Sequence, residues 1–449
     1  MFYKPYRSEM KSVLIISPHF PPVNAPDMQR IRMSLPYYGQ NGWRAEVICV
    51  DPEYVPGYKD LLLSETVPAE IPIHRVRAMP QRLTRKIGFG SVSIRSFYQI
   101  WKKGNELLRS KNFDLVLFST SNFHVLSIGP YWKRKFGVPF IVDLQDPWRN
   151  DFHLASAKKD RPPKYRLAHA LDSWMEARTM PHASGILAVT NSYIQTQKRR
   201  YVALEDVPAD IIPIGASRLD FDFLKCKHLP AKYVVKQEGR IHVVYIGAVP
   251  PAFLPLLRCF FAAFTSAGID RHPYHFYFIG TDYSVGSNKS QVKMLAEEFG
   301  LDQQVTEIPG RIPYFSVLAN LQQSDIIFIP GSKDAGYTAS KIFNSLLCKR
   351  PVFSIFHEDS LVKKLIEECR AGIVVGINEH LPDAAVTERI AAQMEVFNRL
   401  HLLDPGSILD LPPEYDARYL AGMQTKLFDE AINFHLPAAR RIQLIKKYS

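Results

Sequence analysis

Polar residues follow short apolar runs at four places in the sequence, and the first of these combines a histidine, an aspartate and an arginine. Residues 17–22 read Ser-Pro-His-Phe-Pro-Pro and lead into Asp27-Met28-Gln29-Arg30. The two prolines favour an extended loop, and a helix that begins near Asp27 would direct free backbone amides toward an anion. An ordinary loop capped by Asp27 is the competing interpretation.

The second and third places offer groups for proton transfer and sugar binding. Residues 119–124 read Ser-Thr-Ser-Asn-Phe-His, and a histidine such as His124 at the start of a helix can hydrogen-bond a substrate or share a proton with it. Residues 143–148 read Asp-Leu-Gln-Asp-Pro-Trp, where Asp146 can orient a sugar hydroxyl or a cationic group. A structural histidine and a turn with a buried Trp148 are the competing interpretations.

The fourth place carries the largest set of candidate ligand-binding residues. Residues 336–344 read Gly-Tyr-Thr-Ala-Ser-Lys-Ile-Phe-Asn. Thr338 or Ser340 can cap a helix whose amides point to a ligand, and Lys341 lies in the first turn, where the helix dipole disfavours a cation. A bound diphosphate would account for that lysine, and Asn344 would face the same ligand. Arg311 is a further cation at a predicted strand end.

Short runs rich in valine and isoleucine alternate with helix-length amphipathic stretches along most of the chain. The predicted strands are 13–16, 45–50, 71–75, 115–118, 140–143, 185–189 and 210–213, and, after a polar break at 219–238, 241–247, 275–280, 305–308, 325–330, 351–356 and 372–377. The predicted helices are 29–40, 91–111, 124–136, 166–180, 192–201, 253–267, 291–299, 314–323, 339–347, 360–370 and a helical tail over 415–447. Continuous apolar strands separated by helices indicate parallel sheets buried on both faces.

This pattern predicts an α/β protein with two Rossmann-like, doubly wound parallel-sheet domains. The predicted limits are residues 1–222 and 235–410, with helices over 411–449. Ligands bind outside the carboxyl ends of such strands, so two carboxyl edges facing each other would place the site in a cleft between the domains. A single larger sheet is the alternative.

Composition excludes several classes of protein. The chain has 449 residues, of which 46% are hydrophobic and 22% charged, as is normal for a globular protein. Five scattered cysteines without a CxxC pair indicate free thiols in a reducing compartment rather than disulfides or a zinc site. No apolar run reaches the ~20 residues of a spanning helix, so we expect a cytoplasmic chain. P-loop, HExxH, GxSxG and complete GxGxxG motifs are absent.

The formal net charge of +12 indicates an anionic partner. Composition alone does not decide whether that partner is nucleic acid, a membrane face or a phosphorylated ligand. Residues 75–111 concentrate basic side chains among aromatic ones, with Glu106 as the single acid. The basic residues there are Arg75, Arg77, Arg82, Arg85, Lys86, Arg95, Lys102, Lys103, Arg109 and Lys111. This mixture fits an anionic membrane surface, with a solvated helix face as the competing interpretation.

Together these segments resemble glycosyltransferase family 4, whose fold is GT-B. More narrowly, they resemble bacterial members with a double-proline loop followed by Gln-Arg, a hydroxyl-rich segment ending in a histidine, and an Asp-Pro-Trp segment. The resemblance extends over residues 11–400, with little similarity between the motifs. Residues 146–148 and 338–352 are its most specific parts.

The resemblance implies transfer of a sugar from a nucleotide diphosphate sugar, UDP- or GDP-linked, to a glycan or lipid-linked acceptor in surface polysaccharide or glycolipid synthesis. It implies retention of the anomeric configuration and no metal cofactor. The second domain would hold the donor and the first the acceptor, and residues 411–449 would pack back on the first domain. The enzyme would then work in the cytoplasm, peripherally at the inner face of the membrane.

By position in the family's motifs, the resemblance implies catalytic roles for His124 and Asp146. The donor would be bound by Gly247, Arg311, Thr338, Ser340, Lys341 and Asn344, and the acceptor or phosphate-side loop would contain Asn24, Asp27, Arg30 and Ser121. Three positions depart from the family. Asn24-Ala25-Pro26 replaces a glycine pair, Asn344 replaces a ribose-binding carboxylate, and the strand end at Gly247 lacks an arginine–lysine pair.

Two alternatives stay open on the same fold. A nucleotide-sugar epimerase would turn over the donor without an acceptor, and a catalytically degenerate binding or scaffold protein would bind nucleotide without releasing sugar. A nucleic-acid partner is not expected, because no nucleic-acid-binding motif accompanies the positive charge.

Overall fold

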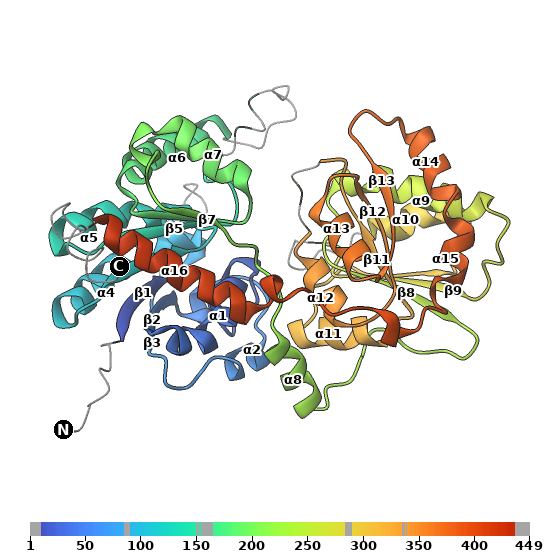
Figure 1. The fold of residues 1–449 in the computed structure, drawn as a ribbon, viewed down its shortest axis with the longest axis horizontal. Helices are drawn as coiled ribbons and strands as arrows, with labels where there is room; N and C mark the ends of the chain where they lie inside the picture. Colours follow the sequence, from blue (N-terminus) through green and yellow to red (C-terminus); the bar gives the residue numbers. More distant parts are fainter. Residues whose placement is uncertain are drawn as a thin grey trace, which may run out of the picture. The chain divides into compact units, whose positions relative to one another are not determined.

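A computed structural model describes residues 10–84, 90–149, 151, 154, 165–282, 290–334, 337 and 339–435, and all structural statements concern these residues. The chain folds into two compact units. The first comprises the described parts of Met1–Ile214 and Ala417–Ser449, and the second is formed from Gly215–Asp416. Each unit is a parallel sheet accompanied by helices (Figure 1).

The first unit contains a seven-stranded sheet in the order β3-β2-β1-β4-β5-β6-β7. Its strands are β1 (Lys11–Ile16), β2 (Trp43–Val50), β3 (Ile73–Val76), β4 (Leu115–Ser119), β5 (Phe140–Leu144), β6 (Gly185–Ala188) and β7 (Ala209–Ile211). Its helices are α1 (Gln29–Tyr38), α2 (Leu61–Glu65), α3 (Gln81–Thr84), α4 (Val92–Ser110), α5 (Gly129–Phe136), α6 (Tyr165–Thr179), α7 (Asn191–Arg200) and α16 (Ala417–His435).

Successive side chains of a strand point to opposite faces of a sheet, and β1 fills two cores in this way. Leu14 and Ile16 enter a core shared with α4 and α5, whereas Val13 and Ile15 enter one shared with α1 and α16. Helices α4 and α5 approach closely at Gly104, where a Cβ atom would lie 2.1 Å from the ring of Trp132.

The C-terminal helix α16 crosses back onto the first sheet, as the resemblance implied. Phe428 packs edge-to-face on Trp43 with ring centroids 5.2 Å apart. The buried Tyr38 hydroxyl donates a 2.6 Å hydrogen bond to Gln424 Oε1, and Gln424 Nε2 donates to Ser34 at 2.8 Å. The helix therefore completes the core of the first unit.

The second unit contains a six-stranded sheet in the order β10-β9-β8-β11-β12-β13. Its strands are β8 (Ile241–Ile246), β9 (Tyr274–Ile279), β10 (Val305–Ile308), β11 (Ile326–Pro330), β12 (Val352–His357) and β13 (Gly372–Ile377). Its helices are α8 (Arg218–Cys226), α9 (Leu254–Ser266), α10 (Gln291–Glu297), α11 (Tyr314–Gln323), α12 (Lys341–Leu347), α13 (Leu361–Glu368), α14 (Asp383–Ala391) and α15 (Met394–Leu400).

The predicted α/β fold with two Rossmann-like parallel sheets is confirmed, and every predicted strand overlaps an observed one. The polar break expected over 219–238 is partly wrong, because α8 lies there. The helix buries Phe221 and Leu224, and Phe223 packs on Phe315 of α11 at 4.6 Å. The first unit therefore ends at Ile214 rather than at residue 222.

Other segments also differ from the sequence prediction. The single helix expected over 124–136 is a 3-10 turn, η5 (Phe123–Ile128), followed by α5. Helices α2, α3, α14 and α15 were not predicted. The predicted tail helix is observed as far as His435, and residues 436–449 lie outside the described part of the chain.

Candidate functional site

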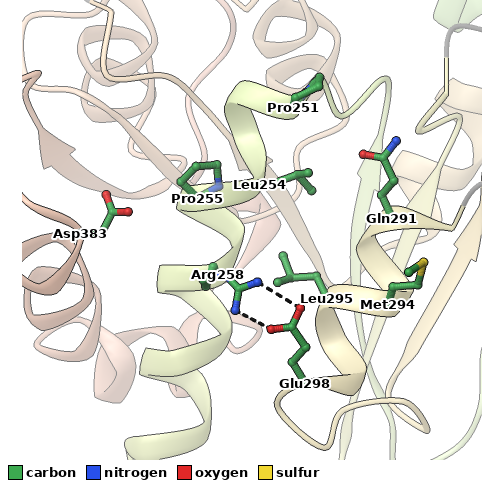
Figure 2. Close-up of a pocket in the computed structure, with 9 residues that line it drawn as sticks. All are labelled: Pro251, Leu254, Pro255, Arg258, Gln291, Met294, Leu295, Glu298 and Asp383. Carbon is green, nitrogen blue, oxygen red and sulfur yellow. Dashed lines mark hydrogen bonds and ion pairs between the residues drawn. The ribbon is translucent and has the colours of Figure 1, made fainter.

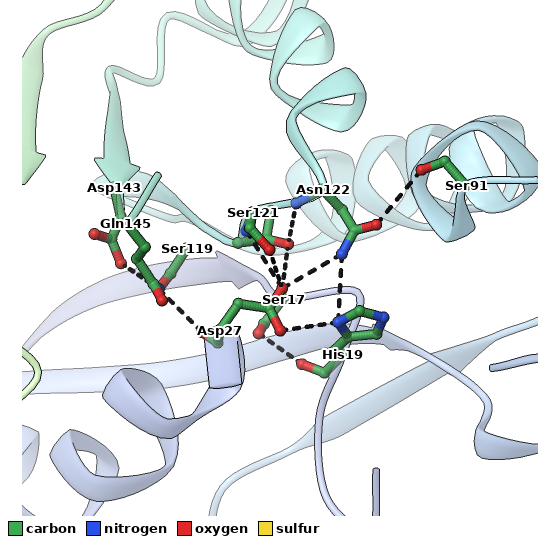
Figure 3. Close-up of polar contacts among 10 residues, drawn as sticks. Ser17, His19, Asp27, Ser91, Ser119, Ser121, Asn122, Asp143 and Gln145 are labelled. Carbon is green, nitrogen blue, oxygen red and sulfur yellow. Dashed lines mark hydrogen bonds and ion pairs between the residues drawn. The ribbon is translucent and has the colours of Figure 1, made fainter. Parts of the chain in front are cut away.

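The order of each sheet indicates where ligands should bind. In the first unit the strand order reverses between β1 and β4, and in the second between β8 and β11. Crevices at the carboxyl ends of such strand pairs are the usual ligand sites of doubly wound sheets. The segments that follow β1, β4 and β5 meet at this edge in the first unit (Figure 3).

Asp27 is the hub of the polar network at this edge. It lies in the 3-10 turn η1 (Pro26–Met28) and is 5% exposed. Its Oδ1 lies 2.8 Å from Nδ1 of His19. Its Oδ2 accepts hydrogen bonds from Thr120 Oγ1 at 2.9 Å and from the Ser121 amide, the Ser121 hydroxyl and Asn122 Nδ2, each at 3.3 Å.

These donors explain the ionisation of Asp27. Burial acts to raise its pKa, but the nearby charge of His19 and hydrogen bonds from His19, Thr120 and Ser121 outweigh burial and hold the pKa below its ordinary value. The predicted residues Asp27 and Ser121 are therefore brought together, and Asp27 is a fixed negative charge.

Arg30 lies inside the first unit, where its guanidinium contacts protein groups. The side chain is 1% exposed, Nε lies 2.9 Å from Asp143 Oδ2, and Nη1 donates to the carbonyl of Pro213 at 3.0 Å. Asp143 Oδ2 also accepts from Ser119 Oγ at 2.6 Å and from Gln145 Nε2 at 2.9 Å. This buried ion pair joins the start of α1 to the end of β5, so the structure gives Arg30 a positioning role beneath the site.

His124 is held by side chains from two other helices. Its Nδ1 lies 3.0 Å from Ser93 Oγ of α4, and its Nε2 lies 3.3 Å from Asp172 Oδ1 of α6. Ser93 Oγ is also 2.6 Å from Ser91 Oγ, which donates a long 3.5 Å bond to Asn122 Oδ1. His124 thus joins the Asp27 network at the same edge, with both ring nitrogens facing protein side chains.

The remaining predicted residues of the first unit lie close by. Asp146 is exposed, and desolvation by the surrounding protein together with the negative charge of Asp27 raises its pKa. Asn24 is buried, and its backbone amide donates to the carbonyl of Tyr58 at 3.0 Å.

The sequence did not assign roles to His19, Asn122, Ser93 or Asp172. His19 and Asn122 stand within segments that the sequence singled out, so their position after a strand was an available signal. Ser93 and Asp172 lie within helices, and no spacing in the sequence relates them to His124.

In the second unit, glycines follow four neighbouring strands at the carboxyl edge. Gly247 follows β8, Gly280 follows β9, Gly310 follows β10 after one proline, and Gly331 follows β11. Gly247 has φ 146° and Gly280 φ 71°, conformations that L side chains rarely adopt. The space beside Gly280 and Gly310 is open, so a ligand could approach the backbone closely there, whereas side chains fill the space beside Gly247 and Gly331.

Lys341 lies against this glycine edge. A Cβ atom at Gly247 would lie 2.4 Å from Lys341 Nζ. The ammonium stands 4.4 Å from the centroid of the Tyr245 ring and donates to the Tyr245 hydroxyl. Burial lowers the pKa of Lys341 to about 7, so an anion at this edge would restore its charge.

The other predicted donor residues are dispersed around the same region. Asn344 Nδ2 donates to the Tyr314 hydroxyl at 3.4 Å, and that hydroxyl donates to Asp220 Oδ2 at 2.9 Å. Asn344 Oδ1 is buried with no hydrogen-bond partner among the described residues. Ser340 and Arg311 are exposed, and Ser340 makes no side-chain cap bond to α12. Thr338 lies outside the described residues.

A surface groove of about 470 Å³ lies between α9 and α10 (Figure 2). Arg258 and Glu298 form a two-pronged ion pair in it, with bonds of 2.6 and 3.0 Å. None of the predicted donor residues lines this groove, so we do not assign the donor to it.

Two kinds of feature are absent from the described residues. They contain no cluster of three or more histidine, cysteine, aspartate or glutamate side chains placed to hold a metal ion. No helix within the described ranges is long and apolar enough to cross a membrane.

Comparison with known proteins supports the fold and part of the function. Residues 29–215 match the sequence profile of the glycosyl transferase 4-like domain. No curated protein sequence matches the chain. The predicted membership in the Asp-Pro-Trp subgroup stays a prediction.

Three solved structures of similar fold cover nearly the whole chain. Sucrose-phosphate synthase from Thermosynechococcus elongatus has 14% identity and a TM-score of 0.55, with 98% of each chain covered. HepE from Anabaena, solved with UDP and glucose, has 14% identity and a TM-score of 0.53, with 98% of this chain and 99% of that chain covered. UDP-GlcNAc 2-epimerase from Methanocaldococcus jannaschii has 12% identity and a TM-score of 0.52, with 94% and 99% covered. At these identities the likeness establishes the fold.

Proposed function

We propose that this protein is a retaining glycosyltransferase that moves a sugar from a nucleotide diphosphate sugar to a glycan or lipid-linked acceptor. The observation that carries the proposal is the position of Lys341, whose amino group lies against the strand-end Gly247 at the carboxyl edge of the second sheet and can bind a diphosphate there. The glycosyl transferase 4-like match over residues 29–215 supports it. HepE was solved with UDP, and this favours UDP over GDP as the nucleotide of the donor.

The proposed chemistry follows from where charge develops. Breaking the bond between the anomeric carbon and phosphate places negative charge on the departing diphosphate, and donors arranged in advance stabilise that charge. Lys341 would do this in the second unit. In the first unit, Asp146 and His124 would hydrogen-bond the hydroxyl groups of the sugars.

A panel of nucleotide sugars tests the proposal. UDP-sugars should raise the melting temperature of the protein, whereas CMP-sugars should not, because they carry no diphosphate. With the matching acceptor, NMR should show a glycosidic product with the donor's anomeric configuration. Conversion of the donor sugar to its epimer without acceptor would instead identify an epimerase. Binding of UDP-sugars without transfer, hydrolysis or epimerisation would identify a catalytically degenerate protein.

A basic and aromatic surface on α4 and α5 favours a membrane-bound acceptor. Tyr98 is 61% exposed and stacks on Trp101, which packs against Tyr131 of α5. The exposed basic residues around them are Lys102, Arg109, Arg134 and Lys135. We call these seven residues the aromatic–basic surface. Aromatic rings and cations of this kind suit the headgroup region of an anionic membrane, so we propose peripheral association with its inner face.

Not every basic residue of 75–111 contributes to that surface. Arg95 is 2% exposed and donates to the carbonyls of Met79 and Tyr54 at 2.7 and 2.8 Å. Lys103 and Lys111 are paired with Glu106 and Glu46. Arg85 and Lys86 lie outside the described residues.

Vesicle flotation tests this surface. The protein should bind vesicles containing phosphatidylglycerol and not vesicles of phosphatidylcholine alone, and binding should weaken as salt rises. Changing Lys102 and Lys135 together to glutamate should abolish binding, while Lys364→Glu, at an exposed position of α13, should not. If the two variants bound anionic vesicles equally well, the proposed membrane association through this surface would be wrong.

A further inference from the structure

Tyr245 is a buried tyrosine of β8 whose hydroxyl reaches the carboxyl edge of the second sheet. The residue is 1% exposed, and its ring packs against Phe278 of β9 with centroids 6.0 Å apart. The hydroxyl donates a 2.6 Å hydrogen bond to the carbonyl of Ala248, which follows the strand. Because a hydroxyl has a single proton, this bond uses it and leaves the oxygen as an acceptor.

The Tyr245 side chain contacts the ammonium of Lys341 in two ways. Its oxygen accepts a hydrogen bond from the ammonium. The ammonium also stands 4.4 Å from the centroid of the Tyr245 ring, within the range at which a ring face attracts a cation. In the described part of the chain, no carboxylate forms an ion pair with Lys341 and no other group accepts a hydrogen bond from its ammonium. Tyr245 is thus the group that fixes this cation.

This contact leaves the ammonium able to bind an anion. An ammonium has three N–H donors, and Tyr245 accepts from one of them. The others lie at the end of β8, where a Cβ atom on Gly247 would be 2.4 Å from Nζ. Burial lowers the pKa of Lys341 to about 7, whereas a hydrogen-bond acceptor and a ring face favour the charged form. Tyr245 therefore acts on both the position and the charge of the ammonium.

We propose that Tyr245 is a positioning residue whose hydroxyl oxygen and ring hold the charged Lys341 ammonium at the end of β8 for the diphosphate of the donor. This role extends the proposed function and rests on it. Every group involved belongs to the second unit. Tyr245 touches no reacting atom and keeps its proton on the Ala248 carbonyl, so it acts through Lys341 alone.

The variant Tyr245→Phe tests the proposal. Phenylalanine keeps the ring but removes the oxygen that accepts from Lys341. We expect UDP affinity at neutral pH to fall by about 10-fold, as for one lost charge-assisted hydrogen bond. The pKa of Lys341 should fall further, so the pH above which UDP affinity declines should move down by about one unit. Titration calorimetry over a range of pH measures both effects, and the ionisation of UDP itself is common to both proteins.

Tyr274 supplies a matched control in the same sheet. It is 0% exposed, and its hydroxyl donates to Asn398 Oδ1 at 2.8 Å. It is the first residue of β9 and so lies at the opposite edge of the sheet from Lys341. Tyr274→Phe should therefore bind UDP with the affinity and pH profile of the wild type. A lost hydroxyl that acted only through the stability of the second unit would change both variants alike.

The role of Tyr245 and the proposed function can fail separately. If Tyr245→Phe binds UDP with the wild-type affinity and pH profile while Lys341→Met loses affinity, Tyr245 has no positioning role and the proposed function stands. If Lys341→Met binds UDP normally, the diphosphate does not bind at Lys341, and the proposed donor site and the role of Tyr245 are both overturned.

A measurement on the wild type decides the question even if Tyr245→Phe does not fold. Protons close to the face of an aromatic ring are shifted upfield in NMR spectra. Proton–carbon spectra of the full chain with labelled lysine should show upfield-shifted ε-protons for Lys341, with nuclear Overhauser contacts to the Tyr245 ring. The signal is assigned by its loss in Lys341→Met. Lys341 ε-protons at the position of exposed lysines, without contact to that ring, would overturn the proposal.

Discussion

Replacing Lys341 with methionine should lower the affinity for UDP by about 10- to 100-fold, because a charge-assisted hydrogen bond to phosphate contributes roughly 1.5–3 kcal/mol. Methionine keeps the length and apolar character of the side chain against Tyr245, so the second unit should stay folded. Titration calorimetry with UDP provides the measurement. Lys364→Met, on an exposed part of α13, is the control and should bind UDP normally.

The pH dependence of this affinity gives a second, sharper result. Burial lowers the pKa of Lys341 to about 7, so above that pH the ligand-free lysine is neutral and binding of an anion requires proton uptake. UDP affinity should therefore fall as pH rises above 7, by up to about tenfold per unit. Calorimetry in buffers of different ionisation enthalpy should report the proton taken up. A pH-independent affinity in the wild type would place the diphosphate elsewhere.

The lowered pKa of Lys341 also makes the stability of the second unit depend on pH. Unfolded, Lys341 has its ordinary pKa of 10.5, so between about pH 7 and 10 the unfolded chain holds a proton that the folded chain lacks. The free energy of unfolding of the second unit should thus rise with pH across that window. Lys341→Met should remove this dependence and stabilise the unit at neutral pH.

Replacing Arg30 with methionine should destabilise the first unit by about 3–5 kcal/mol, because it leaves the carboxylate of Asp143 buried without its ionic partner. Both side chains are almost completely buried, at 1% and 0% exposure. All five tryptophans lie between Trp43 and Trp174, so tryptophan fluorescence during urea unfolding reports on the first unit alone.

Two further variants separate ion pairing from packing. Arg30→Met combined with Asp143→Leu should recover much of the lost stability, because it removes both charges from the interior. Arg258→Met, which breaks an ion pair of two half-exposed side chains, should cost much less, because solvent screens that pair. A loss for Arg30→Met as small as that of Arg258→Met would show that the buried pair contributes little.

The fold could be read from the sequence to a large extent. Runs such as Val13–Ile16 and Ile326–Pro330 are apolar throughout because both faces of their sheets are covered, and helix-length stretches separate them. Helix α8 was missed because apolar side chains alternate with Asp220 and Asp222 in its first half, a pattern that does not indicate a helix. Its packing on α11, which no local pattern reveals, is what keeps it helical.

The site could be predicted only as a set of segments. Position after a strand marked out the loops that carry His19, Asp27, Ser121, Asp146 and Lys341, because strand ends in parallel sheets share one edge. Position after a strand does not predict which side chains point into the interior. Arg30 pairs with Asp143 in the interior, and Arg95 donates to backbone carbonyls rather than facing solvent.

The sequence by itself therefore determined the alternation of strands and helices and the loops at which chemistry can occur, since both depend on the local periodicity of apolar residues. Only the tertiary structure decided which groups meet. Ser93 of α4 and Asp172 of α6 reach the two nitrogens of His124, and Asp27 reaches Thr120 from the end of another strand. Such contacts join residues far apart in the chain, and they depend on the order of strands in the sheet and the direction of each side chain.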